Sequence, residues 1–227
     1  MKFTSQVVSA ASGSVGGQTF SRNRSGQYVR RRSVPVNPNT PNQQAARSAF
    51  TTAVVSWNTV SASIREGWKT YADNVSRRDA LGQVIYATAQ NWYIAVMSIR
   101  AKFAPSTLNL NTAPTIFDRS NLSPPTITVN ATTDEFTINA STSDEWAVNA
   151  GGVLIIKVSR PQPKTINYFT GPFTTGGAII RGDTAPTMPQ TLPLPFPVST
   201  GQRLFFAVSA LTADNRLTEE QILRVDT

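Results

Sequence analysis

The stretch Leu204-Phe205-Phe206-Ala207-Val208-Ser209-Ala210 decides the fold class of the second half of this chain. It is aromatic and aliphatic, and every second residue from Leu204 to Ala210 is apolar. Side chains two residues apart lie on the same face of a strand. The stretch therefore predicts a strand of an antiparallel sheet that is half buried on one side.

The residues around this stretch have the same character. From about Pro105 onward the helical period disappears, and 12 of the 15 prolines lie in this part of the chain. Strands are predicted at 126–131, 135–140, 153–160, 203–211 and 218–225, with turns at 150–152, 176–177 and 214–215. The proline-rich stretch 186–197 is interpreted as a rigid edge or loop of the same sheet structure. About seven short strands in roughly 110 residues are typical of an immunoglobulin-like β-sandwich.

The end of this region also resembles a known domain. The opening stretch, followed by a turn and Leu217-Thr218, resembles the last hairpin of a fibronectin type III domain. Such domains host many functions, so the resemblance implies an architecture and no activity.

The segment 41–104 predicts a small helical bundle. Thr40, Pro41 and Gln43 form a capping-box arrangement at the start of the first helix. Apolar residues then follow at steps of four and three: Ala46, Phe50, Ala53, Trp57 and Val60. A second helix is predicted to open at Ser63. A third carries Trp92, and we expect Trp57, Trp68 and Trp92 in the core of the bundle.

Residues 1–40 predict an extended basic arm that orders only against a neighbour. The arm is rich in Gly, Ser and Arg and has too few large apolar residues for a core of its own. Its segments 19–22 and 27–30 flank turn residues suited to a hairpin. With a linker at 105–121 and a sandwich at 122–227, the expected fold class is α+β and multidomain.

Composition excludes most catalytic chemistry. The chain has no Cys and no His, so thiol nucleophiles are excluded and the commonest general base is missing. Its paired acids are sequence neighbours, which point to opposite faces of a strand. We expect no enzyme activity, no catalytic residue, no cofactor and no metal site. The sequence shows neither a secretory signal nor a membrane span.

The net charge of +8 is concentrated in the first half. Residues 1–103 carry 13 basic and 3 acidic side chains, whereas residues 104–227 carry 8 and 10. The first acid is Glu66, so the arm has no acid at all. We expect a basic arm of this kind to bind an anionic partner.

Candidate partner-binding residues combine arginines with interleaved aromatic residues: Phe20, Arg22, Arg24, Tyr28, Arg30, Arg31 and Arg32. These arginines suit either nucleic-acid phosphates or an acidic surface of other protein subunits. Because no nucleic-acid-binding module is recognisable, protein docking is the favoured interpretation. A second short motif, Arg181-Gly182-Asp183, matches a cell-adhesion tripeptide but is also ordinary turn chemistry.

Residues 13–72 carry a resemblance to a family. The matching pattern is Gly16-Gly17-Gln18-Thr19-Phe20-Ser21-Arg22, Gly26-Gln27-Tyr28-Val29-Arg30, Asn37-Pro38-Asn39-Thr40, Gln43, Arg47, Phe50, Trp57 and Trp68. It resembles a group of uncharacterised proteins encoded in the structural modules of tailed bacteriophages and prophages. The resemblance implies a virion protein and no catalytic residue.

The expected function is that of a non-enzymatic structural protein of a bacteriophage virion, present in the host cytoplasm during assembly. Capsid decoration through the arm and the helical region is the first hypothesis, and a head–tail connector or tail protein is the alternative. The expected partners are capsid, portal or tail subunits, with homo-oligomerisation left open and no membrane. A DNA-binding protein that uses the arginine-rich arm is the hypothesis from another class.

Overall fold

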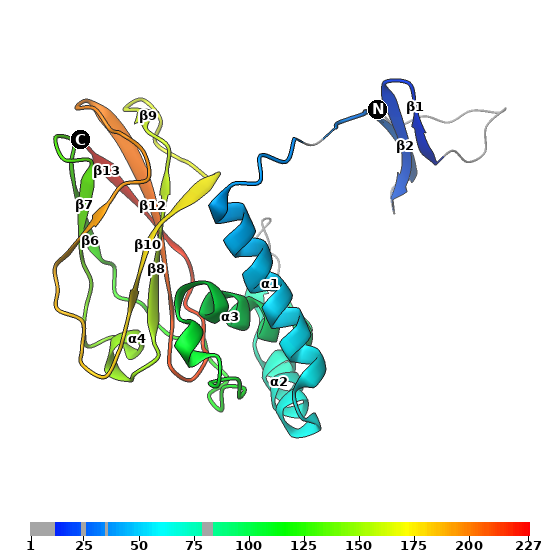
Figure 1. Cartoon of the computed structure of the whole chain (residues 1–227), viewed down its shortest axis with the longest axis horizontal. Coiled ribbons are helices and arrows are strands. Elements are labelled where there is room, and N and C mark those ends of the chain that lie inside the picture. Colours follow the sequence, from blue (N-terminus) through cyan, green and yellow to red (C-terminus); the bar gives the residue numbers. More distant parts are fainter. Residues whose placement is uncertain (1–11, 24–25, 35, 79–83) are drawn as a thin grey trace. The chain divides into compact units, whose positions relative to one another are not determined.

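The computed structural model describes residues 12–23, 26–34, 36–78 and 84–227 (Figure 1). The chain is an α+β protein with helices and antiparallel sheets. It divides into two compact units, Met1–Pro41 and Asn42–Thr227.

The first unit contains one antiparallel sheet. Its strands are β1 (Gly13–Val15), β2 (Gln18–Asn23) and β3 (Gly26–Arg31), in the order β1-β2-β3. Strands β2 and β3 coincide with the two segments that the sequence places on either side of a turn, and Phe20 lies opposite Val29. None of the described residues of this unit is buried, so the sheet has no core there.

The second unit begins with three helices, α1 (Pro41–Thr59), α2 (Ala62–Asn74) and α3 (Ala89–Phe103). Ser61 caps α2, two residues before the predicted start, and accepts a hydrogen bond from the backbone N–H of Ile64. Thr88 caps α3 in the same way. The short elements β4 (Arg77–Arg78), β5 (Val84–Ile85) and the 3-10 turn Pro105–Thr107 complete this region.

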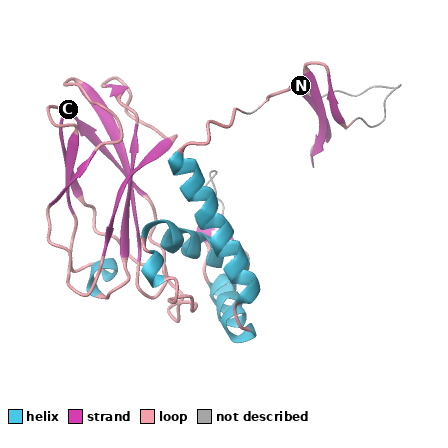
Figure 2. Ribbon diagram, viewed as in Figure 1, coloured by secondary structure: helices cyan, strands magenta, loops and turns pink. Residues whose placement is uncertain are grey.

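Two antiparallel sheets form the rest of the second unit (Figure 2). The larger sheet has the order β10 (Phe173–Ile180), β8 (Val153–Ser159), β12 (Gln202–Leu211) and β13 (Gln221–Asp226), and β9 (Gln162–Pro163) also pairs with β12. The smaller sheet has the order β11 (Gln190–Pro193), β7 (Glu135–Asn139) and β6 (Thr126–Asn130). The short helix α4 (Glu145–Val148) precedes β8.

The two sheets face each other across one core. Leu204, Phe206 and Val208 of β12 lie in it with Phe136 and Ile138 of β7, and all five side chains are fully buried. The alternation predicted for β12 therefore places these residues on the inner face.

Strand β12 is buried on its outer face as well, so the expected half-burial was wrong. Leu211 on that face joins Val153 and Ile155 of β8 in a second core, which they share with the three helices. Phe169 covers Phe205, with the ring centroids 5.5 Å apart. The helices are consequently a layer on the larger sheet rather than a self-contained bundle.

The predicted helical stripe is only partly buried. Trp68 and Trp92 lie in the second core and Trp57 packs against it, but Phe50 is 55% exposed. Ala46 is exposed too, and Ala49 is buried but does not belong to this core, to which α1 contributes Ala53.

Two glycine pairs differ in role. Gly176 and Gly177 lie inside β10 at a register shift, not at the predicted turn. Gly151 has a φ of +96°, and a Cβ built on Gly152 would lie 1.8 Å from the carbonyl oxygen of Trp146. The pair at 151–152 thus allows a close approach of two backbones before β8.

Residues 105–121 do not divide the second unit, although the sequence predicts a linker there between two domains. Helices and sheets on either side of this segment form one compact unit, Asn42–Thr227, with a common core.

Candidate interaction surfaces

The sheet of the first unit separates the candidate partner-binding residues onto two faces. Residues directly opposite each other on paired strands share a face. Phe20 therefore shares one face with Val29 and Arg31, whereas Tyr28 and Arg30 lie on the other. Because neighbouring residues of a strand alternate, the sheet does not gather all the arginines on one side.

The described arginines of the arm are available to a partner. Arg30, Arg31 and Arg32 are exposed and form no ion pair with any other described residue. The backbone N–H of Arg32 donates to the carbonyl oxygen of Gly17 at 2.8 Å, which continues the pairing of β2 with β3. Arg24 and the side chain of Arg22, also predicted to bind the partner, lie outside the described residues.

A second surface, which the sequence did not predict, lies along the segment 116–120 of the second unit. A larger groove of about 580 Å³ runs beside Phe117 and Asp118 and reaches Val84 and Glu219. A smaller groove of about 250 Å³ adjoins Ile116. We call residues 116–120 and these two grooves the double groove.

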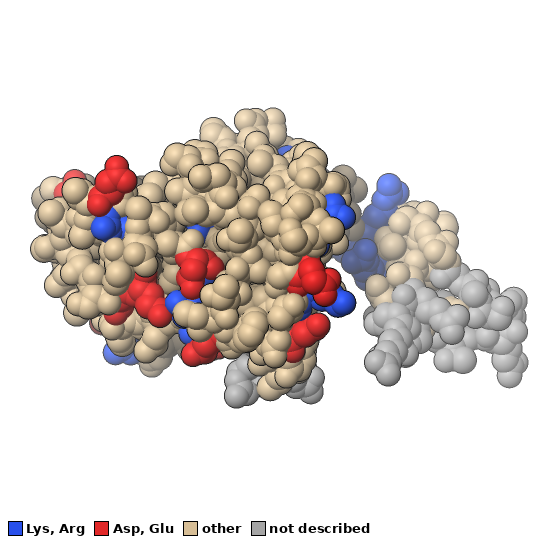
Figure 3. All heavy atoms as spheres, turned by 90° about the horizontal axis from the view of Figure 1, so that it is seen from below, with Lys and Arg blue, Asp and Glu red and all other residues tan. Residues whose placement is uncertain are grey.

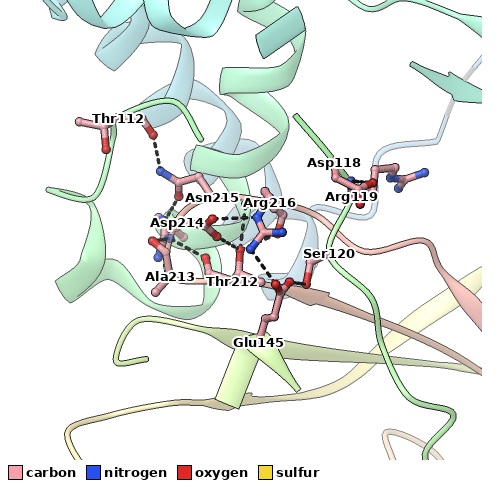
Figure 4. A network of polar contacts seen from close by, with 11 residues as sticks. Thr112, Asp118, Arg119, Ser120, Glu145, Thr212, Ala213, Asp214, Asn215 and Arg216 are labelled. Atoms are coloured by element: carbon pink, nitrogen blue, oxygen red, sulfur yellow. Dashed lines mark hydrogen bonds and ion pairs between the residues drawn. The ribbon is translucent and has the colours of Figure 1, made fainter. Parts of the chain in front are cut away.

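Three residues that line the smaller groove, Glu145, Asp214 and Arg216, form an ion-pair network (Figure 4). The guanidinium of Arg216 lies 3.0 Å from Glu145 and 2.7 Å from Asp214. Ser120 donates to Glu145, and Thr212 donates to Asp214. Burial alone lowers the pKa of Arg216, but the hydrogen bonds to Asp214 and Glu145 outweigh it and raise this pKa above its ordinary value.

Beside this network, a second arginine is completely buried, and no carboxylate among the described residues forms an ion pair with it. Arg100 of α3 uses all five of its N–H groups, on Asn215 (2.7 Å), Gly151 (2.9 Å), Thr107 (3.0 Å), and the carbonyl oxygens of Thr212 and Ala213 (3.1 Å each). Burial lowers its pKa to about 10, although Asp214 acts in the opposite direction. Asn215 in turn donates to Leu110 and Thr112, so these bonds tie α3 to the turn between β12 and β13.

The tripeptide Arg181-Gly182-Asp183 is exposed only in part. The Nε of Arg181 donates to the carbonyl oxygen of Ala147 at 2.8 Å, and its Nη1 donates to the carbonyl oxygen of Gly182. The guanidinium is therefore engaged within the chain.

Sequence reasoning missed the double groove because its residues come from distant segments. Ile116, Glu145 and Asp214 are ordinary surface residues in the sequence and meet only in the folded unit. The one available signal was the unusual adjacency of Ile116 and Phe117, two large apolar residues in a segment predicted to be a linker.

Two further features of the described residues concern metal binding and membrane crossing. The described residues include no group of three or more His, Cys, Asp or Glu placed to hold a metal ion. None of the described helices combines the length and apolar character needed to cross a membrane.

Comparison with solved structures gives a distant similarity of fold. No protein-family model and no curated protein matches the chain. A solved structure described as a Fn3-like protein from Clostridium thermocellum is 14% identical and superposes with a TM-score of 0.31, over 48% of this chain and 94% of that chain. The class of this chain follows from its own geometry: an α+β protein with two facing antiparallel sheets, a helical layer and a separate basic sheet.

Proposed function

We propose that this chain is a non-enzymatic structural protein of a bacteriophage virion, which binds an acidic protein surface through its basic arm. The observation that carries the proposal is the sheet of the first unit: it has no buried described residue, and it presents three exposed arginines. A sheet without a core gains its stability from a partner. The assignment to a phage particle is supported by the resemblance of residues 13–72, and capsid decoration is the role we favour over a connector or tail role.

The second unit then supplies the projecting or packing body of the protein. We infer that its β layers are an immunoglobulin or fibronectin type III-like sandwich, a fold that serves many cell-surface and binding proteins as a scaffold. The two facing antiparallel sheets with antiparallel neighbours throughout support this assignment.

Particle incorporation tests the proposal. Particles assembled from the encoding phage or prophage genome would carry Arg30→Ala, Arg31→Ala and Arg32→Ala together. Because guanidinium–carboxylate contacts supply the attachment, incorporation is expected to fall by about tenfold or more in both empty and DNA-filled particles. The matched control removes three exposed cations of the second unit instead, Arg160, Lys164 and Arg224, and is expected to incorporate normally.

The same experiment tests the DNA-binding alternative. Normal incorporation into empty shells, with loss only from DNA-filled ones, would show that the arm binds DNA phosphates and would overturn protein docking. Salt sensitivity does not separate the two, because both contacts weaken as salt rises.

A further inference from the structure

The double groove combines exposed apolar side chains with polar ones. Ile116 and Phe117 are each 49% exposed, Val148 is 54% exposed and Val84 is 55% exposed, and all four line one of the two grooves. Val84 and Phe117 line the larger groove, whereas Ile116 and Val148 line the smaller one. Exposed apolar groups with polar neighbours suit the binding of another protein.

The rim of the double groove is acidic. Asp118, Glu145, Asp214 and Glu219 are exposed there, and the cations among them point into the protein or are paired. Arg216 is 7% exposed and is shared between two carboxylates, while Arg119 is paired with Glu219 at 2.9 Å. On the face of the second unit seen from below, acidic side chains stand in several groups with basic side chains beside most of them, between wide uncharged areas (Figure 3). The charge left for a partner at the double groove is therefore negative.

The arm has the complementary chemistry. Arg31 shares one face of its sheet with Phe20 and Val29, Arg30 shares the other face with Tyr28, and no acid occurs before Glu66. An aromatic side chain fills an apolar groove while neighbouring guanidinium groups pair with carboxylates on the rim. The same polypeptide thus carries both halves of a matched interface.

We propose that the arm of one copy of this chain docks on the double groove of a second copy. This inference rests on the proposed function and names the acidic partner of the arm. Each copy contributes one arm and one double groove, so the contact is heterologous and links copies head to tail into a ring or an open row.

The geometry predicts a weak contact that acts through repetition. A six-residue strand is ~20 Å long and three strands span ~10 Å, so the buried area is well below that of a stable dimer. The segment 32–40 between β3 and α1 spans at most ~30 Å when extended, which gives the arm reach toward a neighbour. On a particle surface, many such contacts add by avidity.

Sedimentation velocity of the purified full-length chain over a concentration series tests the inference. The wild-type protein is expected to sediment faster as its concentration rises, and salt is expected to weaken this association. Two variants are expected to weaken it by about tenfold or more: the arm variant with Arg30, Arg31 and Arg32 changed to Ala, and the groove variant with Ile116→Lys and Asp118→Lys. The control Glu135→Lys with Tyr168→Lys makes the same charge change on residues that line neither groove and is expected to associate normally.

Mixing the two variants identifies the partner. The arm variant keeps an intact groove and the groove variant keeps an intact arm, so an equimolar mixture is expected to form heterodimers at concentrations where each variant alone stays monomeric. Thermal unfolding of each variant, with a melting temperature equal to that of the wild type, shows that both variants are folded. If the wild-type chain stays monomeric at every concentration, docking on a second copy is wrong. The same holds if the mixture of variants stays monomeric. Neither result bears on attachment to another virion protein, because particle incorporation measures that separately.

Discussion

Arg100 shows how one residue joins two parts of the second unit. Burying a guanidinium costs solvation free energy, and in the described part of the chain no carboxylate is paired with this one to offset the cost. Instead, all five N–H groups donate to oxygens from the 3-10 turn, the loop before β8 and the turn after β12. The arginine supplies a donor to the carbonyl oxygens of Gly151 and Ala213, and a second donor to that of Thr212, which also accepts from the backbone N–H of Asn215.

We therefore predict that Arg100→Met destabilises the protein by about 3 kcal/mol. Methionine fills similar space but leaves several buried acceptors without a donor, at about 1 to 3 kcal/mol each, and part of this loss is regained because no charge is buried. In a unit of this size the melting temperature is expected to fall by roughly 10 °C, measured by calorimetry. Arg160→Met, at an exposed arginine, is the control and is expected to melt like the wild type. An unchanged melting temperature for Arg100→Met would refute the role assigned to this residue.

The raised pKa of Tyr71 leads us to expect that the protein loses stability at alkaline pH. Burial raises its pKa from 10.0 to about 12, partly opposed by Arg119 and Arg216, and its hydroxyl has no hydrogen-bond partner among the described residues. Between pH 10 and 12 the unfolded chain releases this proton while the folded chain retains it. The stability from this group is therefore complete below pH 10 and falls by on the order of 2 kcal/mol as pH rises through 12.

Denaturant unfolding at pH 8 and pH 11 measures this effect. Tyr71→Phe is expected to lose less stability over that interval than the wild type. At pH 8 it is expected to be at least as stable, because the change removes a buried hydroxyl without a partner. An equal loss in both proteins would assign the alkaline sensitivity to other groups.

At the scale of elements, the sequence pattern of a strand predicted which of its residues face a core. It did not predict whether another element covers the opposite face of that strand. The period-two pattern of β12 placed Leu204, Phe206 and Val208 correctly on the inner face. Its outer face is buried only because helices from a distant part of the chain lie on it, a contact that local periodicity does not contain. The stripe through Phe50 failed for the converse reason: it is helical and apolar, yet little packs on the first half of α1.

The same limit applies to the two interaction surfaces. The arm is contiguous in sequence and strongly charged, so composition revealed its candidate residues, although not their division between two faces. The double groove combines residues from separate segments of the chain, such as Glu145 and Arg216, and only the fold brings them together.

The shared core predicts that the β layers do not fold alone. Without the helices, Val153, Ile155 and Leu211 lose their cover, at ~1.5 to 3 kcal/mol for each aliphatic side chain. The acceptors of Arg100 lose their donor as well. That sum is comparable to the whole stability of a typical domain.

We expect the fragment 42–227 to melt cooperatively and the fragment 122–227 to remain largely unfolded, as followed by circular dichroism. A cooperative transition of 122–227 near the temperature of 42–227 would instead support the domain boundary that the sequence predicts.

At the scale of the whole molecule, the two units differ in how their strands are stabilised. Strands β8 and β12 are buried on both faces within the second unit. Strands β1 to β3 have no buried residue among those described, and their hydrogen bonds are accessible to water. Local opening costs least where few apolar groups are buried, so the free energy of opening is expected to differ strongly between the units.

Hydrogen–deuterium exchange on the full-length chain tests this difference and links it to assembly. In dilute solution, peptides from residues 13–31 are expected to exchange completely at the earliest times, while peptides from residues 202–211 stay protected for hours, because only the latter need global unfolding to exchange. At concentrations where copies associate, or within the particle, the arm peptides are expected to gain protection as a partner covers their sheet. The arm variant lacking Arg30, Arg31 and Arg32 is the control and is expected to gain none. Equal protection of both regions in dilute solution would mean that the arm sheet is stable by itself, and the requirement for a partner would then be wrong.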